Sequence, residues 1–262
     1  MCVKSRCGLT LLEVMIAMSI MTLIAGTLGT LARAVQMSSD YTEGHAAATQ
    51  HARVSLERIT RAVNQAPASE SFPGAAVLSE SVSGWRFPDT LVVWRPSGAA
   101  ANPNGRPLFS EIVVFCPDPA TPNRLLEITA PTDLRTVPPL TDSSSWAAEL
   151  TALKASTTAK KVLLSDLIRV SSTSNGGSKR GNVRFESRLR PDATQWAGYR
   201  GGTTAWEDLA WVQGLYGSRT GLAQNWVRIE LQLLPGSAAN HASDQQVLPY
   251  FGSAAVYYQL TQ

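Results

Sequence analysis

Apolar and polar positions divide the chain into three stretches. Residues 1–8 are mixed, residues 9–31 form an almost uninterrupted apolar run, and the remainder is patterned in shorter periods. Because about 20 predominantly apolar residues suffice to span a bilayer, the run predicts a transmembrane helix over residues 9–31. No second run approaches the roughly 18 apolar residues that a further span needs, so a single-pass protein is expected.

Beyond the run, apolar side chains recur every three or four residues, which is typical of a helix with one buried face. This stripe consists of Ala48, Ala52, Leu56, Ile59, Val63 and Ala66. It predicts an amphipathic continuation of the helix over residues 32–66, ended by Pro67. Gly44 and residues 38–40 are expected places for a break or bend, and we leave open whether residues 9–66 form one helix. The stripe is too short for a coiled coil, which favours packing against the protein's own sheet.

Residues 67–262 read as short strands separated by long loops. Apolar runs or alternating patterns predict strands over residues 91–94, 111–115, 124–129, 183–189, 227–233 and 254–260. The second and third of these are expected to form a hairpin, with a short helix over residues 145–154 and a loop over residues 171–182. The fold class is therefore α+β: a long amino-terminal helix packed on a carboxyl-terminal antiparallel β-rich head.

Glu13 places a carboxylate near the start of the apolar run. Ionisable side chains inside a membrane segment are costly to bury, and they are functional by default. The alternative is a carboxylate that only reaches the membrane edge.

The segment at residues 8–13 (Gly-Leu-Thr-Leu-Leu-Glu) resembles the class III signal of type IV pilins and type II secretion pseudopilins. The resemblance implies a leader of residues 1–8, with Lys4 and Arg6 as its charges, cut by prepilin peptidase between Gly8 and Leu9. It further implies methylation of Leu9, where the family usually has Phe, and places Glu13 fifth in the mature chain. In the family this Glu pairs with the terminal amine of a neighbouring subunit.

The same resemblance implies the partners and the location of the protein. The expected partners are prepilin peptidase, other pilin or pseudopilin subunits, the inner-membrane assembly platform and membrane lipid. Because Lys4 and Arg6 precede the apolar run, the amino end is expected in the cytoplasm and the head outside it, on a bacterial inner membrane. Thr30 stands where major pilins usually carry Pro, and the pattern of residues 54–63 is similar to the J-type minor pseudopilins and W-type minor pilins.

The apolar run also has three other interpretations. A secretory signal cut after residues 32–34 would have about 7 to 15 apolar residues, fewer than this run contains. A lipoprotein signal needs a Cys after an apolar stretch, and neither Cys2 nor Cys7 follows one. An uncleaved anchor that carries a binding domain and does not polymerise remains the alternative from another class, and a competence minor pilin that handles DNA is the alternative within the family.

Charge and cysteine content argue against a nucleic-acid-binding protein and against a head held by a disulfide. Without Lys4 and Arg6 the 23 basic residues fall to 21 against 20 acidic ones, which gives nucleic-acid binding no support, although a local patch stays possible. Removal of the leader leaves Cys116 as the single cysteine, so the head would be held by its apolar core instead of a disulfide.

Evidence for catalysis is thin, and we expect neither an enzyme nor a metal or cofactor. His45, His51 and His241 do not form a ligand cluster with other residues, and no nucleophile elbow or phosphate loop occurs. The aromatic region at residues 196–226 suggests a partner surface through Trp196, Tyr199, Trp206 and Trp211, whereas a second small core beneath the loops is the preferred interpretation. The basic residues of the neighbouring region are Lys179, Arg180, Arg184, Arg188 and Arg190. We interpret them as a solvated strand face and do not expect nucleic acid among the partners.

Overall fold

The computed structural model describes residues 10–82, 85–172, 178–212, 221–235 and 247–261. The chain divides into two compact units, Met1–Ala46 and Ala47–Gln262. Helix α1 (Leu11–Asn64) belongs to both and runs without interruption through residues 38–40 and Gly44, so no break occurs where one was expected.

In the first unit, residues 10–43 are all exposed, including large apolar side chains such as Leu11 and Met15. Four hydroxyl groups of the apolar run bond to the helix backbone: Ser19 donates to the carbonyl of Met15 at 2.8 Å, and Thr22, Thr27 and Thr30 donate to carbonyls three residues earlier. A helix that meets its own polar groups and presents apolar side chains outward is suited to lipid. Within the described residues, α1 is the one helix that is long and apolar enough to cross a membrane.

The second unit begins with a five-stranded antiparallel sheet in sequential order. Its strands are β1 (Ala75–Val82), β2 (Trp85–Trp94), β3 (Ile112–Pro117), β4 (Leu125–Thr129) and β5 (Lys160–Ser165). A short 3-10 helix, η1 (Phe109–Glu111), precedes β3, and helix α2 (Ser143–Ala155) lies between β4 and β5 in the sequence. Strands β3 and β4 form the hairpin expected from the sequence.

A second antiparallel sheet has the order β10–β9–β8, and β6 pairs with β7 in a small ribbon. The strands are β6 (Val170–Ser172), β7 (Lys179–Gly181), β8 (Val183–Arg190), β9 (Leu222–Leu233) and β10 (Leu248–Gln259). Helix α3 (Ala193–Arg200) and the 3-10 turn η2 (Trp206–Asp208) follow β8.

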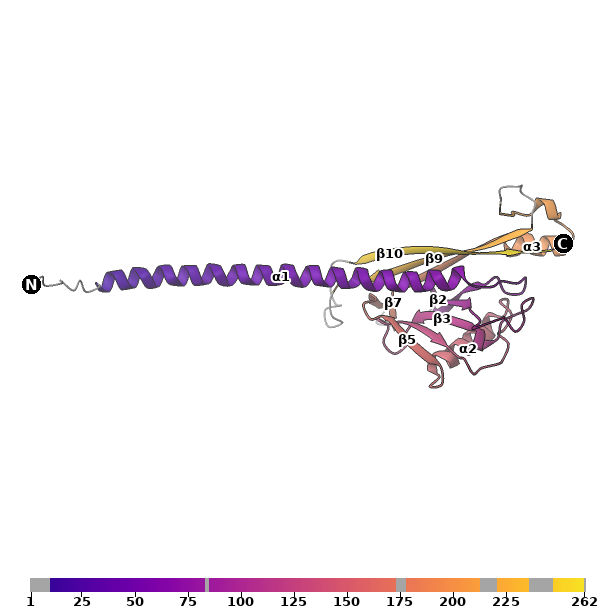
Figure 1. Ribbon diagram of the computed structural model, residues 1–262, viewed down its shortest axis with the longest axis horizontal. Helices are drawn as coiled ribbons and strands as arrows, with labels where there is room; N and C mark the ends of the chain where they lie inside the picture. Colours follow the sequence, from indigo (N-terminus) through magenta and orange to yellow (C-terminus); the bar gives the residue numbers. More distant parts are fainter. Residues whose placement is uncertain (1–9, 83–84, 173–177, 213–220, 236–246, 262) are drawn as a thin grey trace, which may run out of the picture. The chain divides into compact units, whose positions relative to one another are not determined.

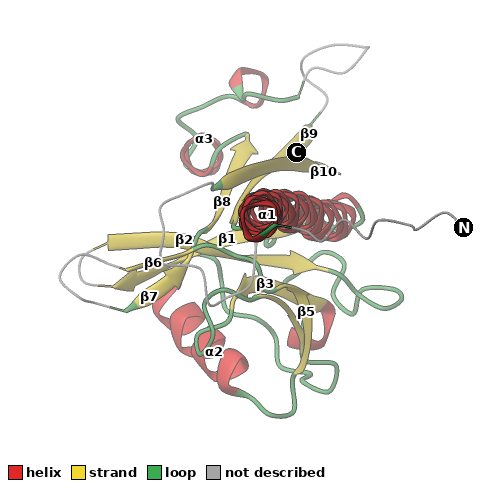
Figure 2. Cartoon of the chain, turned by 90° about the vertical axis from the view of Figure 1, so that its left-hand side faces the viewer, coloured by secondary structure: helices red, strands yellow, loops and turns green. Residues whose placement is uncertain are grey.

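Two cores hold the head together. In the first, the part of α1 from Ala48 onward lies between the two sheets, as Figures 1 and 2 show, and Ile59 and Val63 are fully buried against them. In the second, α2 covers the other face of the five-stranded sheet with Trp146 and Leu150. The five-stranded sheet is therefore buried on both faces, whereas the three-stranded sheet is buried on one.

The expected stripe on α1 is confirmed, and Ser55 and Ala62 are buried with it. The expected strands and the helix near residues 145–154 are confirmed with shifted ends. The expected loop over residues 171–182 is wrong at both ends, where β6 and β7 form; residues 173–177 lie outside the described part. Strands β1 and β5 and helix α3 were not expected.

A buried carboxylate ties α1 to the five-stranded sheet. Glu127 on β4 retains 5% of its side-chain exposure; its Oε1 accepts from Nη2 of Arg58 at 3.2 Å and lies 3.6 Å from Nη1 of Arg95. Nε of Arg58 donates to the other carboxylate oxygen, and this pairing raises the pKa of Arg58. The position of the helix on the sheet is thus set by a polar contact as well as by packing.

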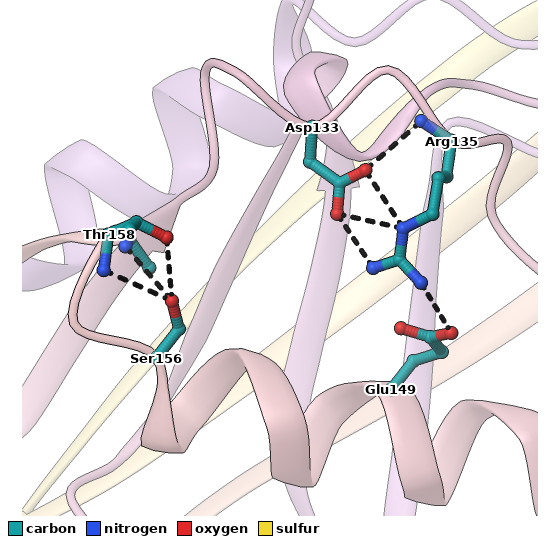
Figure 3. Close-up of polar contacts among 6 residues, drawn as sticks. Asp133, Arg135, Glu149, Ser156 and Thr158 are labelled. Carbon is teal, nitrogen blue, oxygen red and sulfur yellow. Dashed lines mark hydrogen bonds and ion pairs between the residues drawn. The ribbon is translucent and has the colours of Figure 1, made fainter.

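Helix α2 is fastened at its outer side by a second arginine, Arg135 (Figure 3). Its guanidinium donates to Asp133 from Nη2 at 2.7 Å and to Glu149 on α2 from Nη1 at 2.9 Å. The hydrogen bonds from Arg135 lower the pKa of Asp133, and both carboxylates raise the pKa of Arg135. All three side chains serve this contact, so none of them indicates a ligand site.

Candidate functional site

The expected processing and assembly site lies at the start of α1. Lys4, Arg6, Gly8 and Leu9 fall outside the described residues. The described residues begin at Thr10, the second residue after the expected cleavage point, and include Glu13.

Glu13 and Thr10 bond to each other across the first helical turn. Oε2 of Glu13 accepts from the backbone N–H of Thr10 at 2.8 Å and from its hydroxyl at 3.0 Å, and the N–H of Glu13 donates to Oγ1 of Thr10 at 3.3 Å. This is a capping box, in which Thr and a Glu three residues later satisfy each other's backbone groups. The spacing of Thr10 and Glu13 is thus a signal in the sequence for the start of the helix.

The carboxylate of Glu13 therefore already has a partner within its own chain. In an apolar medium a polar group without one is costly. Both hydrogen bonds end on Oε2, and a carboxylate offers about four acceptor positions on its two oxygens, so the cap does not exhaust what Glu13 can accept.

The four aromatic residues expected at a partner surface do come together. Ring centroids lie 5.3 Å apart for Trp196 and Tyr199, 5.3 Å for Tyr199 and Trp206, and 4.4 Å for Trp206 and Trp211. Trp211 is buried on Leu209, whereas the other three rings are half-buried. We call Trp196, Tyr199, Trp206 and Trp211 the aromatic cluster.

Two contacts fix the aromatic cluster to the rest of the head. Glu70 accepts from Nε1 of Trp196 at 3.3 Å and also pairs with the Arg200 guanidinium. Tyr258 of β10 packs beneath the rings, and burial raises its pKa to about 12. The cluster thus combines a small core with three partly open rings. Of the other aromatic residues in the region, Trp226 faces away on β9 and Tyr216 lies outside the described residues.

The expected basic run is divided by the fold. Arg180 is turned inward, with Nη1 3.0 Å from Asp89 and Nη2 3.1 Å from Glu80, and its guanidinium covers the Phe87 ring. Burial raises the pKa of Asp89 in spite of this neighbour. Arg184, Arg188 and Arg190 instead point outward from β8, as expected for a solvated strand face.

One His, Ser and Asp grouping in the head has the composition of a hydrolase triad. Nδ1 of His51 lies 3.3 Å from Oγ of Ser165 and 3.7 Å from Oδ1 of Asp166. A triad needs the nucleophile and the acid on opposite ring nitrogens, whereas here both approach the same one. The arrangement is a surface contact between α1 and the end of β5. Among the described residues, no group of three or more His, Cys, Asp or Glu is placed to hold a metal ion, and Cys116 is buried with a pKa raised by that burial to about 12.

Comparison with known proteins identifies the amino-terminal segment. Residues 3–29 match the family model described as a prokaryotic N-terminal methylation motif. No curated protein and no solved structure matches the chain. The methylation motif, the apolar helix behind it and the antiparallel head together support a type IV pilin-like protein with a single-pass amino-terminal anchor.

Proposed function

We propose that the protein is a structural, non-enzymatic subunit of a type II secretion pseudopilus or a type IV pilus. Prepilin peptidase cuts it between Gly8 and Leu9, Leu9 is methylated, and residues 9–31 hold it in the bacterial inner membrane with the head outside the cytoplasm. The observation that carries the proposal is the match of residues 3–29 to the methylation motif. The exposed apolar surface of residues 11–31 supports it, because this surface needs either lipid or neighbouring helices.

Within this class, the subunit is a minor one of the J type or W type. Support comes from Thr30 in place of the usual Pro and from the size of the head, whose two sheets enclose the second half of α1. The three half-buried rings of the aromatic cluster then offer a surface for a neighbouring subunit, since rigid aromatic side chains are favoured anchors at protein interfaces.

The mature amino terminus tests the processing step. Mass spectrometry of the protein from cell envelopes is expected to find N-methylated Leu9, and Gly8→Ala is expected to leave the leader in place. A chain that still begins at Met1 would contradict the proposal and favour an uncleaved anchor. A chain that begins at Val35 would favour a secreted protein.

Two substitutions at Glu13 separate assembly from helix capping. Glu13→Gln retains an acceptor for the Thr10 N–H, because Gln also serves in a capping box, but it removes the charge. Glu13→Val removes both. If a charge pair with a neighbouring amine guides assembly, both variants are processed and held in the membrane, and both enter filaments poorly.

Filament content is measured by shearing or crosslinking after expression at the wild-type level. Normal incorporation of Glu13→Gln together with failure of Glu13→Val would show that the carboxylate serves the cap alone. Normal incorporation of both would refute the pairing mechanism.

A further inference from the structure

The sheet of β8, β9 and β10 packs one face on α1 and leaves the other open. This open side, which we call the outer face, carries both guanidinium groups and aromatic rings. Its principal members are Arg188, Arg190, Trp226, Arg228, Phe251 and Tyr257. Phe251 and Tyr257 are 55% and 56% exposed, and the Arg188 side chain is 71% exposed.

Strand register brings these residues into adjacent rows. Arg188 pairs with Trp226, which pairs in turn with the small residue Ala255. In the next row toward the end of β8, Arg190 lies opposite Gln224, which lies opposite Tyr257. Neighbouring strands are about 4.8 Å apart and alternate residues about 7 Å apart, so each ring has a guanidinium group within reach.

The side chains already interact in this way. The Arg188 guanidinium lies 5.9 Å from the Trp226 ring centroid and that of Arg228 lies 5.3 Å from the Phe251 centroid. Gln224 donates to the Tyr257 hydroxyl at 2.9 Å. Each of the three rings therefore has a polar neighbour and remains partly open to solvent.

Local charge on this side is positive although the chain is nearly neutral. Strand pairing puts four arginines on this side, Arg184, Arg188, Arg190 and Arg228, against the two glutamates Glu186 and Glu230, and Glu186 is paired with Arg188 at 3.0 Å. Near the start of β8, a hollow of about 560 Å³ is lined by Ser79, Arg86, Pro88 and Arg184. It adds the guanidinium group of Arg86 beside that of Arg184.

We propose that the outer face binds single-stranded nucleic acid. Bases stack on exposed aromatic side chains and phosphates bind arginine, and an open sheet that carries both is a stacking platform for unpaired bases. A duplex would present no unpaired bases to the rings, and the surface has no helix to enter a groove. A polyanion without rings would use the guanidinium groups and leave Trp226, Phe251 and Tyr257 idle.

This inference departs from the expectation drawn from net charge, because β9 and β10 contribute Arg228 and three rings that the basic run of β8 did not include. It is independent of the proposed function, since purified protein tests it without any filament.

The test is fluorescence anisotropy of a labelled oligothymidylate of about 20 nucleotides, longer than the site of one small binding module. The probe is titrated with the full chain in a nonionic detergent. Trp226→Thr and Phe251→Thr keep strand-forming residues and remove rings, and each is expected to weaken binding about tenfold. Arg188→Gln and Arg228→Gln are expected to weaken binding and to reduce the salt slope by about 0.7 each. Tyr41→Ala and Arg61→Gln, an exposed ring and an exposed arginine on α1, are matched controls and should bind as the wild type.

Dextran sulfate and polyglutamate serve as competitors without bases. The proposal is supported if both compete weakly and if the ring variants lose affinity for oligothymidylate alone. It is overturned if the wild type does not bind the oligonucleotide, if ring variants bind it as tightly as the wild type, or if polyglutamate competes equally well, which would indicate an acidic protein partner. Circular dichroism checks the fold of each variant, and the exposed Phe251 gives a second ring test should Trp226→Thr unfold.

Discussion

The contact between α1 and the sheet predicts an asymmetric response to two substitutions. Arg58→Gln leaves the carboxylate of Glu127, which has 5% of its side chain exposed, with Arg95 3.6 Å away as its remaining cation. Glu127→Gln leaves two arginines, each with 45% of its side chain exposed, which water can solvate. Stranding a buried charge costs about 3 to 5 kcal/mol, whereas a hydrogen bond to a charged group contributes about 1.5 to 3 kcal/mol.

We therefore expect Arg58→Gln to lower the free energy of unfolding by about 3 kcal/mol and Glu127→Gln by about 2 kcal/mol. For a domain of this size, 1 kcal/mol corresponds to roughly 2 to 4 °C in Tm, so the first variant should melt about 6 to 12 °C lower. Thermal unfolding of the full chain in detergent, followed by tryptophan fluorescence, measures both values.

Arg61→Gln is the matched control, because it removes an arginine three residues further along the same helix. Nη2 of Arg61 lies 2.7 Å from Oε1 of Glu57, but both side chains are more than half exposed. The substitution should therefore lower the free energy of unfolding by at most about 0.5 kcal/mol. If Arg61→Gln lowers Tm as much as Arg58→Gln, or if Glu127→Gln is the more damaging of the two, the account of the buried carboxylate is wrong.

Three further predictions concern the head. Ile59→Ala should lower the free energy of unfolding by about 2 to 5 kcal/mol, because the fully buried Ile59 side chain packs in the first core. Chemical denaturation measures this change, and substitution of the half-exposed Val54 by Ala is the control. Asp142 caps α2, and hydrogen bonds from Ser145 and Ser144 lower its pKa to about 2. The stabilisation should therefore be complete above its unfolded pKa of about 3.9 and should be lost as pH falls through about 2, and Asp142→Asn should remove this acid dependence in melting curves. Gly221→Ala should destabilise the head more than Gly202→Ala. Both glycines have a positive φ, but a Cβ at residue 221 would lie 2.5 Å from the Leu260 carbonyl oxygen, whereas a Cβ at residue 202 would meet open space. The Tm values of the two variants test this difference.

The sequence predicted those helices and strands in which burial produces a regular pattern of apolar residues. The α1 stripe and the alternation in β9 follow from burial on one face, and the apolar runs of β2 and β3 follow from burial on both. Strands β1 and β5 have mixed patterns, because their ends extend beyond the cores, and they were missed. Helix α3 was missed although Asp192 and Gln195 form a capping box, which was a readable signal.

The candidate sites were predicted less completely because they depend on residues distant in sequence. Glu70 joins Trp196 and Arg200 across more than 120 positions, and Asp89 removes Arg180 from the basic run. The outer face likewise exists through the register of three strands. Residue types in the sequence suggested that aromatic and basic side chains could cluster, but the tertiary contacts and the pairing of strands determine which of these side chains lie together.

The capping box of Thr10 and Glu13 affects how a subunit of the proposed kind is held in a membrane before assembly. Before assembly, a lone carboxylate in lipid would have no partner, and the Thr10 N–H and hydroxyl supply one. Cleavage after Gly8 would free an amine on Leu9, the residue directly before Thr10, so every subunit would carry an acceptor and a donor at the same end of its helix. Because both hydrogen bonds of the cap end on Oε2 of Glu13, the amine of a neighbour could bind the acceptor positions that the cap leaves free, so pairing would not require the cap to break. A buried charge pair of this kind is better suited to setting the register between helices than to holding them together, which would leave the strength of a filament to the exposed apolar surface of residues 11–31.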